Sequence, residues 1–264
     1  MHGKTIVESQ RVSKRFGDFT AVDGVDYSIF EGEAAGIIGP NGAGKSTFFN
    51  LITGLYHPSE GVIRFSGRDV TRLSADQRVG MGMVRTFQLV SVFDSLPVMD
   101  NLVLAVVRAS PDFVHKSRLM VGSAHPKHVR AACEEALTRV QLEQKAGFMT
   151  SELSYGDKRM LEIAMALALK PKLLLLDEPL AGLSDVEINQ VLSLVRKVSE
   201  ELTVVIIEHK ISYLVGLVSR LSVMHEGRFI AEGRPQDVLC DLTVRRVYWG
   251  EHDPACDAPA ASPE

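Results

Sequence analysis

Residues 39–46 read Gly39-Pro40-Asn41-Gly42-Ala43-Gly44-Lys45-Ser46, which fits the pattern GxxxxGK[ST]. The stretch follows the apolar, strand-like run Ala34–Ile38 and precedes a helical pattern that begins at Lys45. Glycines allow backbone N–H groups to turn inward around phosphates, and a helix N-terminus adds partial positive charge. We therefore expect a phosphate loop for a nucleotide, with Lys45 on the β- and γ-phosphates and the Ser46 hydroxyl on Mg²⁺. The alternative, a glycine-rich turn with an exposed lysine, does not require this order of strand, loop and helix.

Two later strand patterns end in side chains suited to the same chemistry. The four leucines of Leu173–Leu176 lead into Asp177 and Glu178, and the pattern Thr203–Glu208 leads into His209. In a parallel sheet the carboxyl ends of the strands meet at one edge, where α/β folds bind ligands. We expect Asp177 to join the Mg²⁺ shell, Glu178 to polarise the attacking water, and His209 to contact the γ-phosphate or align that water. The alternative, in which Asp177 and Glu178 merely turn the chain, leaves the phosphate loop without a carboxylate.

The alternation of helical and strand patterns predicts an α/β fold, a P-loop NTPase core built on a parallel sheet. Short mixed patterns at the start predict an N-terminal antiparallel β-subdomain, and helical patterns in the middle predict an inserted α-helical subdomain. The expected elements include strands Thr5–Val12, Val22–Ile29, Gly61–Phe65, Ser222–His225 and Arg228–Ala231, and helices Val98–Val107, Val129–Val140 and Gln236–Val247. We expect a core of residues 1–88 and 153–250, a helical subdomain of residues 89–152, and a disordered tail of residues 251–264.

The composition of the 264 residues limits the classes of partner. The net charge is −4, so no global basic field is available to attract nucleic acid. No stretch approaches the roughly 18 apolar residues of a spanning helix, and no signal-peptide core follows Met1. Cys133, Cys240 and Cys256 form no CxxC pair, which favours reduced, structural thiols. We expect a chain that stays in the cytosol, binds no nucleic acid and reaches a membrane only through a partner.

The stretch Leu153-Ser154-Tyr155-Gly156-Asp157, which opens a helix, narrows the function. Together with the motifs above, it resembles the nucleotide-binding subunit of ATP-binding cassette (ABC) transporters, and the resemblance covers nearly the whole chain. The resemblance implies that Gly39–Ser46 is Walker A, Leu153–Asp157 the signature, Asp177-Glu178 Walker B, Gln88 the Q-loop residue and His209 the switch histidine. Phe16 falls where an aromatic ring of that family stacks on adenine. A small core aromatic is the alternative for Phe16.

The resemblance implies an ATPase that uses ATP and Mg²⁺. Its implied site residues are Lys45, Glu178 and His209 for catalysis, Phe16, Gly39–Ser46, Thr47 and Gln88 for the nucleotide, Ser46, Gln88 and Asp177 for Mg²⁺, and Ser154, Tyr155, Gly156 and Asp157 for the ATP of a partner. The implied partners are a second ABC ATPase subunit, identical or different, two integral membrane permease subunits and, indirectly, a periplasmic or extracellular solute-binding protein. The implied location is the cytoplasmic face of the plasma (inner) membrane, through the permease subunits.

Several segments resemble one branch of the family, the ATP-binding subunits of uptake systems for branched-chain or related amino acids. They are Arg85-Thr86-Phe87-Gln88, the Leu-Ser-Tyr-Gly form of the signature, Glu162-Ile163-Ala164 and the ending from Val238 to Glu251. None of them contacts the transported solute, so an ATPase for urea, a short amide or another solute stays open. A soluble, non-transport ABC ATPase also stays open, although such proteins usually carry two cassettes or a long coiled coil. A phosphotransferase would leave the signature without a purpose, and Glu178 with His209 argues against a nucleotide sensor without turnover.

Three residues depart from the commoner family pattern. Tyr155 replaces a glycine of the signature, Asp157 replaces a glutamine, and Ser184 stands at the usual aspartate of the D-loop. Asp157 has two interpretations. It forms a helix capping box with Ser154, or its charge modulates the partner's ATP site, with the adjacent Lys158-Arg159 offsetting that charge.

A short-spaced set of possible metal ligands, His115, His125, His128 and Cys133, lies in the middle of the chain. Lysines and arginines surround this set and disfavour a bound cation. We therefore expect a solvated basic face here rather than a metal site.

Overall fold

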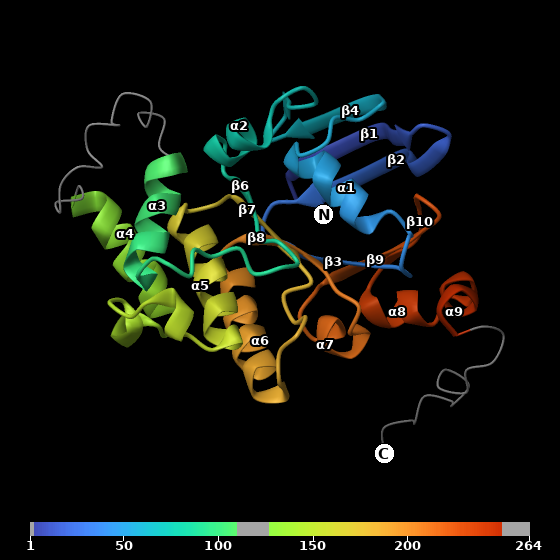
Figure 1. Ribbon diagram of the computed structural model, residues 1–264. Helices are drawn as coiled ribbons and strands as arrows, with labels where there is room; N and C mark the ends of the chain where they lie inside the picture. Colours follow the sequence, from blue (N-terminus) through green and yellow to red (C-terminus); the bar gives the residue numbers. More distant parts are fainter. Residues whose placement is uncertain (1–2, 110–126, 250–264) are drawn as a thin grey trace, which may run out of the picture.

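The computed structural model describes residues 3–109 and 127–249, and its centre is a six-stranded sheet (Figure 1). The strand order is β10-β9-β3-β8-β7-β6. The bounds are β3 (Ala34–Ile38), β6 (Met83–Arg85), β7 (Leu173–Asp177), β8 (Thr203–Ile207), β9 (Arg220–His225) and β10 (Arg228–Gly233). Strands β9, β3, β8, β7 and β6 run parallel, and β10 pairs antiparallel with β9. Every residue of β3, β7 and β8 is buried, which explains their continuous apolar sequences.

A second, antiparallel sheet is formed by the N-terminal part of the chain, as predicted. Its order is β2-β1-β4-β5, with β1 (Thr5–Phe16), β2 (Phe19–Phe30), β4 (Glu60–Phe65) and β5 (Arg68–Asp69). The first two strands extend beyond the predicted bounds because register shifts allow their pairing to continue past local irregularities. They join at Gly17-Asp18, where Gly17 has a φ of 58° that favours glycine.

The two faces of the central sheet support separate apolar cores. One face packs with helix α1 (Lys45–Thr53) and the antiparallel sheet, so that α1 lies between the two sheets (Figure 1). The opposite face carries the remaining helical cover. Alternate residues of one strand pack into different cores: Leu175 packs into the core with α1, and Leu176 packs into the core on the opposite face. The phosphate-loop helix is therefore fixed on both sides by buried apolar contacts.

The other α-helices are α2 (Ala75–Gly80), α3 (Val98–Ala109), α4 (Lys127–Arg139), α5 (Tyr155–Ala168), α6 (Asp185–Ser199), α7 (Ile211–Val215), α8 (Pro235–Leu239) and α9 (Leu242–Trp249). Short 3₁₀ turns occupy Glu143–Lys145 and Thr150–Glu152. Helices α3 and α4 pack against α5, and the two predicted helices of the middle segment are thereby confirmed (Figure 1). Within the described ranges, no helix is long and apolar enough to cross a membrane.

The structure also differs from the sequence-based expectations near the end of the described chain and in two short elements before Gln88. The predicted single helix Gln236–Val247 is wrong, because Asp241 accepts the N–H groups of Thr243 at 2.7 Å and Val244 at 3.2 Å and so caps a new helix. Strand β6 and helix α2 were not expected, since three and six residues are too short to show a period. The expected tail, residues 251–264, lies outside the described residues.

Candidate functional site

The phosphate loop connects the end of β3 to the start of α1. Gly44 has a φ of 100°, and a Cβ atom there would lie 2.4 Å from the Ala21 carbonyl oxygen, so only glycine fits. Lys45 donates from Nζ to the carbonyl oxygens of Gly39 at 2.6 Å and Pro40 at 3.0 Å. Burial lowers the pKa of the Lys45 amine, and the nearby carboxylates of Glu178 and Asp177 oppose that shift. A cation is thus held inside a glycine-rich loop at a helix N-terminus.

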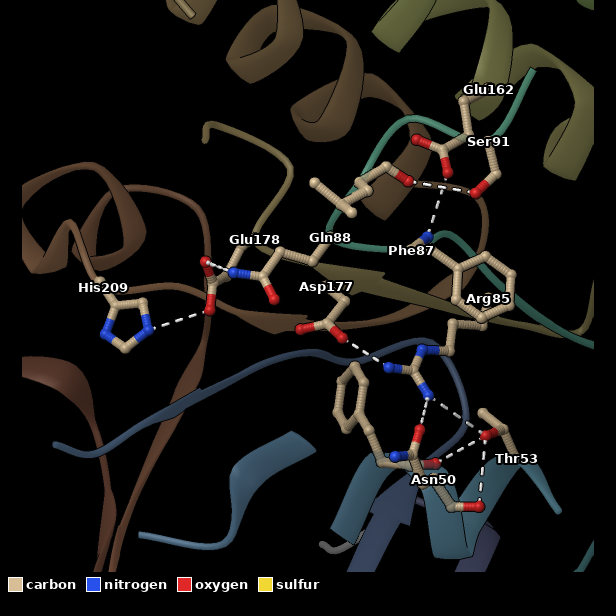
Figure 2. A network of polar contacts seen from close by, with 12 residues as sticks. Asn50, Thr53, Arg85, Phe87, Gln88, Ser91, Glu162, Asp177, Glu178 and His209 are labelled. Carbon is tan, nitrogen blue, oxygen red and sulfur yellow. Dashed lines mark hydrogen bonds and ion pairs between the residues drawn. The ribbon is translucent and has the colours of Figure 1, made fainter. Parts of the chain in front are cut away.

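The parallel strands bring the other candidate residues to the same sheet edge. Strands β3, β8, β7 and β6 are consecutive neighbours, and their carboxyl ends carry the phosphate loop, His209, Asp177-Glu178 and Arg85. Glu178 lies between two side chains: its Oε1 is 2.9 Å from His209 Nε2, and its Oε2 accepts from Gln88 Nε2 at 2.9 Å (Figure 2). Glu178 also has a φ of 48°, a conformation rare outside glycine. The arrangement can hold a carboxylate base in one orientation beside a phosphate site.

Asp177 uses one carboxylate oxygen for an ion pair, and its other oxygen has no partner within the part of the chain that the structure describes. Arg85 Nη2 lies 2.5 Å from Asp177 Oδ2, and the two side chains are 8% and 4% exposed. Asp177 Oδ1 is buried and has no hydrogen-bond partner among the described residues. A carboxylate oxygen of this kind suits Mg²⁺, which prefers oxygen ligands and takes the rest of its shell from phosphates and water. Ser46, the second residue of α1, supplies a hydroxyl at the adjoining helix start.

Glu208 is a site residue that sequence reasoning missed. Its buried carboxylate accepts the N–H groups of Leu180 at 2.8 Å, His209 at 3.0 Å and Lys210 at 3.4 Å. Burial raises the pKa of this carboxyl group, and the three N–H groups oppose the shift. Glu208 therefore ties the loop after β7 to the loop after β8. The available signal was a glutamate placed directly after an apolar strand and before His209.

The signature helix α5 begins with a single cap rather than a capping box. Ser154 Oγ accepts the Asp157 N–H at 3.1 Å, but among the described residues the Asp157 carboxylate accepts no reciprocal bond from the Ser154 N–H. Instead Asp157 pairs with Lys145, whose Nζ lies 2.5 Å from Oδ2. The expectation that Lys158-Arg159 offsets the charge of Asp157 is also wrong, since Lys158 pairs with Asp94 at 2.7 Å.

The N–H group of Gly156 is occupied by a carboxylate of the same chain. It donates to Glu187 Oε1 at 3.0 Å, while Glu187 Oε2 accepts from the Ser184 N–H and hydroxyl at 2.9 and 2.7 Å. These hydrogen bonds lower the pKa of Glu187, with the Ser184 hydroxyl the largest cause. Ser184 thus caps α6, and Tyr155 packs against Gly182 in the preceding turn. The start of α5 can bind an anion, because it already binds one.

A buried ion pair joins α5 to the backbone around Gln88. Arg159 is fully buried and pairs through Nη1 with Glu162 Oε2 at 2.7 Å. It also donates to the carbonyl oxygens of Phe87 at 2.8 Å and Gln88 at 2.7 Å, and Glu162 accepts the Phe87 N–H at 3.1 Å. Sequence reasoning used Glu162 only as a branch marker and missed this connection between the signature helix and the Q-loop segment.

Phe16 lies at the end of β1 with its side chain 45% exposed, so its interpretation as a core aromatic is wrong. The ring meets Tyr56 edge-on at 5.5 Å, and Lys14 Nζ lies 5.2 Å from its centroid. The ring is therefore available for stacking.

Of the possible metal set, His115 and His125 lie outside the described residues, and the described ranges contain no cluster of three metal-binding side chains. Cys133 is buried, which raises its pKa to about 11.

Known proteins resemble this chain over most of its length. Residues 22–181 match a family model described as ABC transporter. The chain is 35% identical over 254 residues to the high-affinity branched-chain amino acid transport ATP-binding protein BraF of Pseudomonas aeruginosa, covering 94% of this chain and 99% of that protein. It is 32% identical over 247 residues to the lipopolysaccharide export system ATP-binding protein LptB of Acidithiobacillus ferridurans, covering 93% and 97%.

Solved structures of the same type match over the same length. A nucleotide-free ATP-binding cassette from an ABC transporter is similar with a TM-score of 0.83 and 31% identity, covering 94% of this chain and all of that one (100%). A dimeric cassette in a post-hydrolysis state, bound to ADP and Pi, is similar with a TM-score of 0.74 and 26% identity, covering 87% and 99%. These matches agree with the predicted α/β fold.

Proposed function

The chain belongs to the ABC transporter family, and we propose that it is the ATP-hydrolysing subunit of an importer for branched-chain or related amino acids. The observation that carries the ATPase part is the single sheet edge at which Lys45, Glu178 and His209 meet. The similarity to the relative named as a branched-chain amino acid transport protein supports the solute class. A different solute or a soluble ATPase would use the same edge, so the solute requires its own test.

In the proposed reaction, ATP binds with its phosphates in Gly39–Ser46 and Thr47. Lys45 exchanges the loop carbonyls for the β- and γ-phosphates, and the exposed ring of Phe16 stacks on adenine. Glu178 accepts the proton of the attacking water, and His209 keeps that carboxylate and the γ-phosphate in line. Mg²⁺, when bound, would neutralise charge on the phosphates. The residues proposed to hold it are Ser46, Asp177 through Oδ1, and Gln88.

The proposed partner at the signature is a second ABC ATPase subunit, identical or different. Ser154, Tyr155 and Gly156 would meet the ATP held by that partner, and the anion-binding start of α5 supports this role. Asp157 belongs to the same signature, but its carboxylate pairs with Lys145, and we propose that it acts on stability rather than on that ATP. Similarity to a dimeric cassette supports the same arrangement.

Two permease subunits are the proposed membrane partners, at the cytoplasmic face of the inner membrane, with a solute-binding protein acting through them. The exposed apolar side chains of Phe87, Leu89 and Phe93, which follow the end of β6, support this contact.

For the division of the chain we propose a core of residues 1–88 and 153–250 and a helical subdomain of residues 89–152. The net charge of −4 supports the expectation of no nucleic-acid partner.

The solute is tested by uptake in cells whose only copy of this chain carries Lys45→Ala. Uptake of labelled leucine is expected to fall to background, because the variant cannot hold the phosphates. Loss of urea uptake with leucine uptake unchanged would move the solute to the amide class and leave the ATPase assignment intact. If leucine uptake and urea uptake are both unchanged and lipopolysaccharide export is defective, the result would favour the export function named for the relative LptB.

Asp157→Gln is expected to lower the free energy of unfolding by less than about 1 kcal/mol and to leave ATP hydrolysis unchanged. The reason is that the Lys145–Asp157 pair is partly exposed, with side chains 39% and 24% exposed. Thermal unfolding and phosphate release measure the two quantities. Lys145→Gln is the matched control, since it breaks the same pair from the other side. A large change in hydrolysis in Asp157→Gln alone would instead assign Asp157 to the partner's ATP.

A further inference from the structure

We propose that Arg85 is a positioning residue for Mg²⁺. Its guanidinium holds one oxygen of the Asp177 carboxylate, so that the other oxygen faces the metal. The inference rests on the proposed function, because it concerns the same nucleotide site. Arg85 ends β6, beside β7, and its guanidinium lies between α1 and Asp177 (Figure 2). No motif in the sequence assigns this residue a role in the site.

The Arg85 guanidinium is fixed on four sides. Nη2 donates to Asp177 Oδ2 at 2.5 Å, and Nη1 donates to Asn50 Oδ1 at 2.5 Å. The cation lies over two aromatic rings, 5.6 Å from the centroid of Phe49 and 5.3 Å from that of Phe87. Asn50 and Phe49 belong to α1, the helix that begins at the phosphate loop. The position of the Asp177 carboxylate is therefore set relative to that loop.

The pairing geometry differs from that of a purely structural ion pair. A buried arginine and carboxylate can form two parallel hydrogen bonds, which satisfy both oxygens. Here Arg85 Nε and Asp177 Oδ1 are both buried and both lack a hydrogen-bond partner among the described residues. A buried acceptor without a partner is costly and calls for a ligand. The monodentate pair compensates the charge of Asp177 on one side and leaves Oδ1 for the metal, directly or through a water.

The test compares nucleotide binding with and without the metal in Arg85→Gln and Arg85→Lys. Binding of a fluorescent ATP analogue is measured first in EDTA and then during titration with Mg²⁺. We expect Mg²⁺-free binding to stay near wild type, because the phosphate loop is intact. The Mg²⁺ concentration for half-saturation is expected to rise about tenfold in Arg85→Gln, as for other residues that orient a metal ligand. A smaller rise is expected in Arg85→Lys, which keeps one charged bond.

The matched control is Arg220→Lys, which alters another arginine–carboxylate pair with side chains 14% and 13% exposed. Arg220 starts β9, and Glu33 directly precedes β3. This pair therefore lies at the amino ends of the parallel strands, away from the carboxyl ends that carry the nucleotide site. The control is expected to lower the melting temperature and leave the Mg²⁺ half-saturation unchanged.

Two results would overturn the role of Arg85. One is an unchanged Mg²⁺ half-saturation in both folded variants. The other is equal weakening of Mg²⁺-free and Mg²⁺-dependent binding, which indicates a general structural role. If Arg85→Gln does not fold, Arg85→Lys decides alone. Failure of the wild-type chain to bind ATP at all would instead count against the proposed function, so the two failures are distinguishable.

Discussion

Glu178→Gln is expected to reduce ATP hydrolysis by about 10²–10⁴-fold while ATP binding is retained. The amide has nearly the shape of the carboxylate and can still bond to His209, but it cannot accept the proton of the attacking water. The phosphate loop lies on a different strand end and is not altered. Because ATP is then bound and not consumed, dimers held together by ATP are expected to accumulate. Phosphate release and size-exclusion chromatography with and without ATP measure both effects.

The control is Glu135→Gln, the same change at an exposed position on α4. Its hydrolysis and its oligomeric state are expected to match the wild type. Glu178→Gln protein that stays monomeric with ATP and still transfers phosphate to a small molecule would contradict the ABC mechanism and favour a phosphotransferase. Hydrolysis within the wild-type range would contradict the role of Glu178 alone, and the solute assignment would be untouched.

Glu162→Ala is expected to lower the free energy of unfolding by about 3–5 kcal/mol, because it leaves the Arg159 guanidinium buried without its carboxylate. Glu162 is only 6% exposed, and Arg159 is fully buried. The burial raises the pKa of Glu162, and the Phe87 N–H and Arg159 oppose the shift. The Phe87 N–H would also lose its acceptor. Urea denaturation measures the change.

A matched exposed pair on α4, Arg130 with Glu134, provides the comparison. Glu134→Ala is expected to change the free energy of unfolding by no more than about 1 kcal/mol, since water replaces the lost partner. Equal effects of Glu162→Ala and Glu134→Ala would show that the buried pair is not needed for stability. Glu162→Gln separates charge from shape, because its amide oxygen can still accept the Phe87 N–H.

The sequence was most informative where a short run of consecutive residues determines both the local structure and its chemical role. The phosphate loop needs glycine at positions such as Gly44 and a lysine at Lys45, so eight consecutive residues specify both geometry and chemistry. The five-residue apolar runs of β7 and β8 specify buried parallel strands, whose shared edge brings Glu178 and His209 together. Boundaries were less predictable, as the new helix begun by Asp241 shows.

The missed residues act through partners that are distant in the chain. Arg85 and Asp177 are separated by 92 positions, and Arg159 and Phe87 by 72. No local pattern marks such pairs, because an arginine that binds a buried carboxylate and one that faces water look the same in a sequence. The short strand β6 decides where Arg85 lies, and three residues do not show a period. Pairing within the folded chain, rather than residue type, assigns these roles.

If the proposed partner docks its ATP at the start of α5, the hydrogen bond from Gly156 to Glu187 makes that docking an exchange rather than an addition. The incoming anion replaces a carboxylate of the same chain, which α6 keeps at high local concentration as a tethered competitor. The free energy gained at the Gly156 N–H group is then only the difference between the hydrogen-bond free energies of the phosphate and of the Glu187 carboxylate. When the phosphate leaves, Glu187 can reoccupy the N–H group at once. In the proposed dimer, separation of the two closed subunits would therefore not expose an unsatisfied donor at the start of α5.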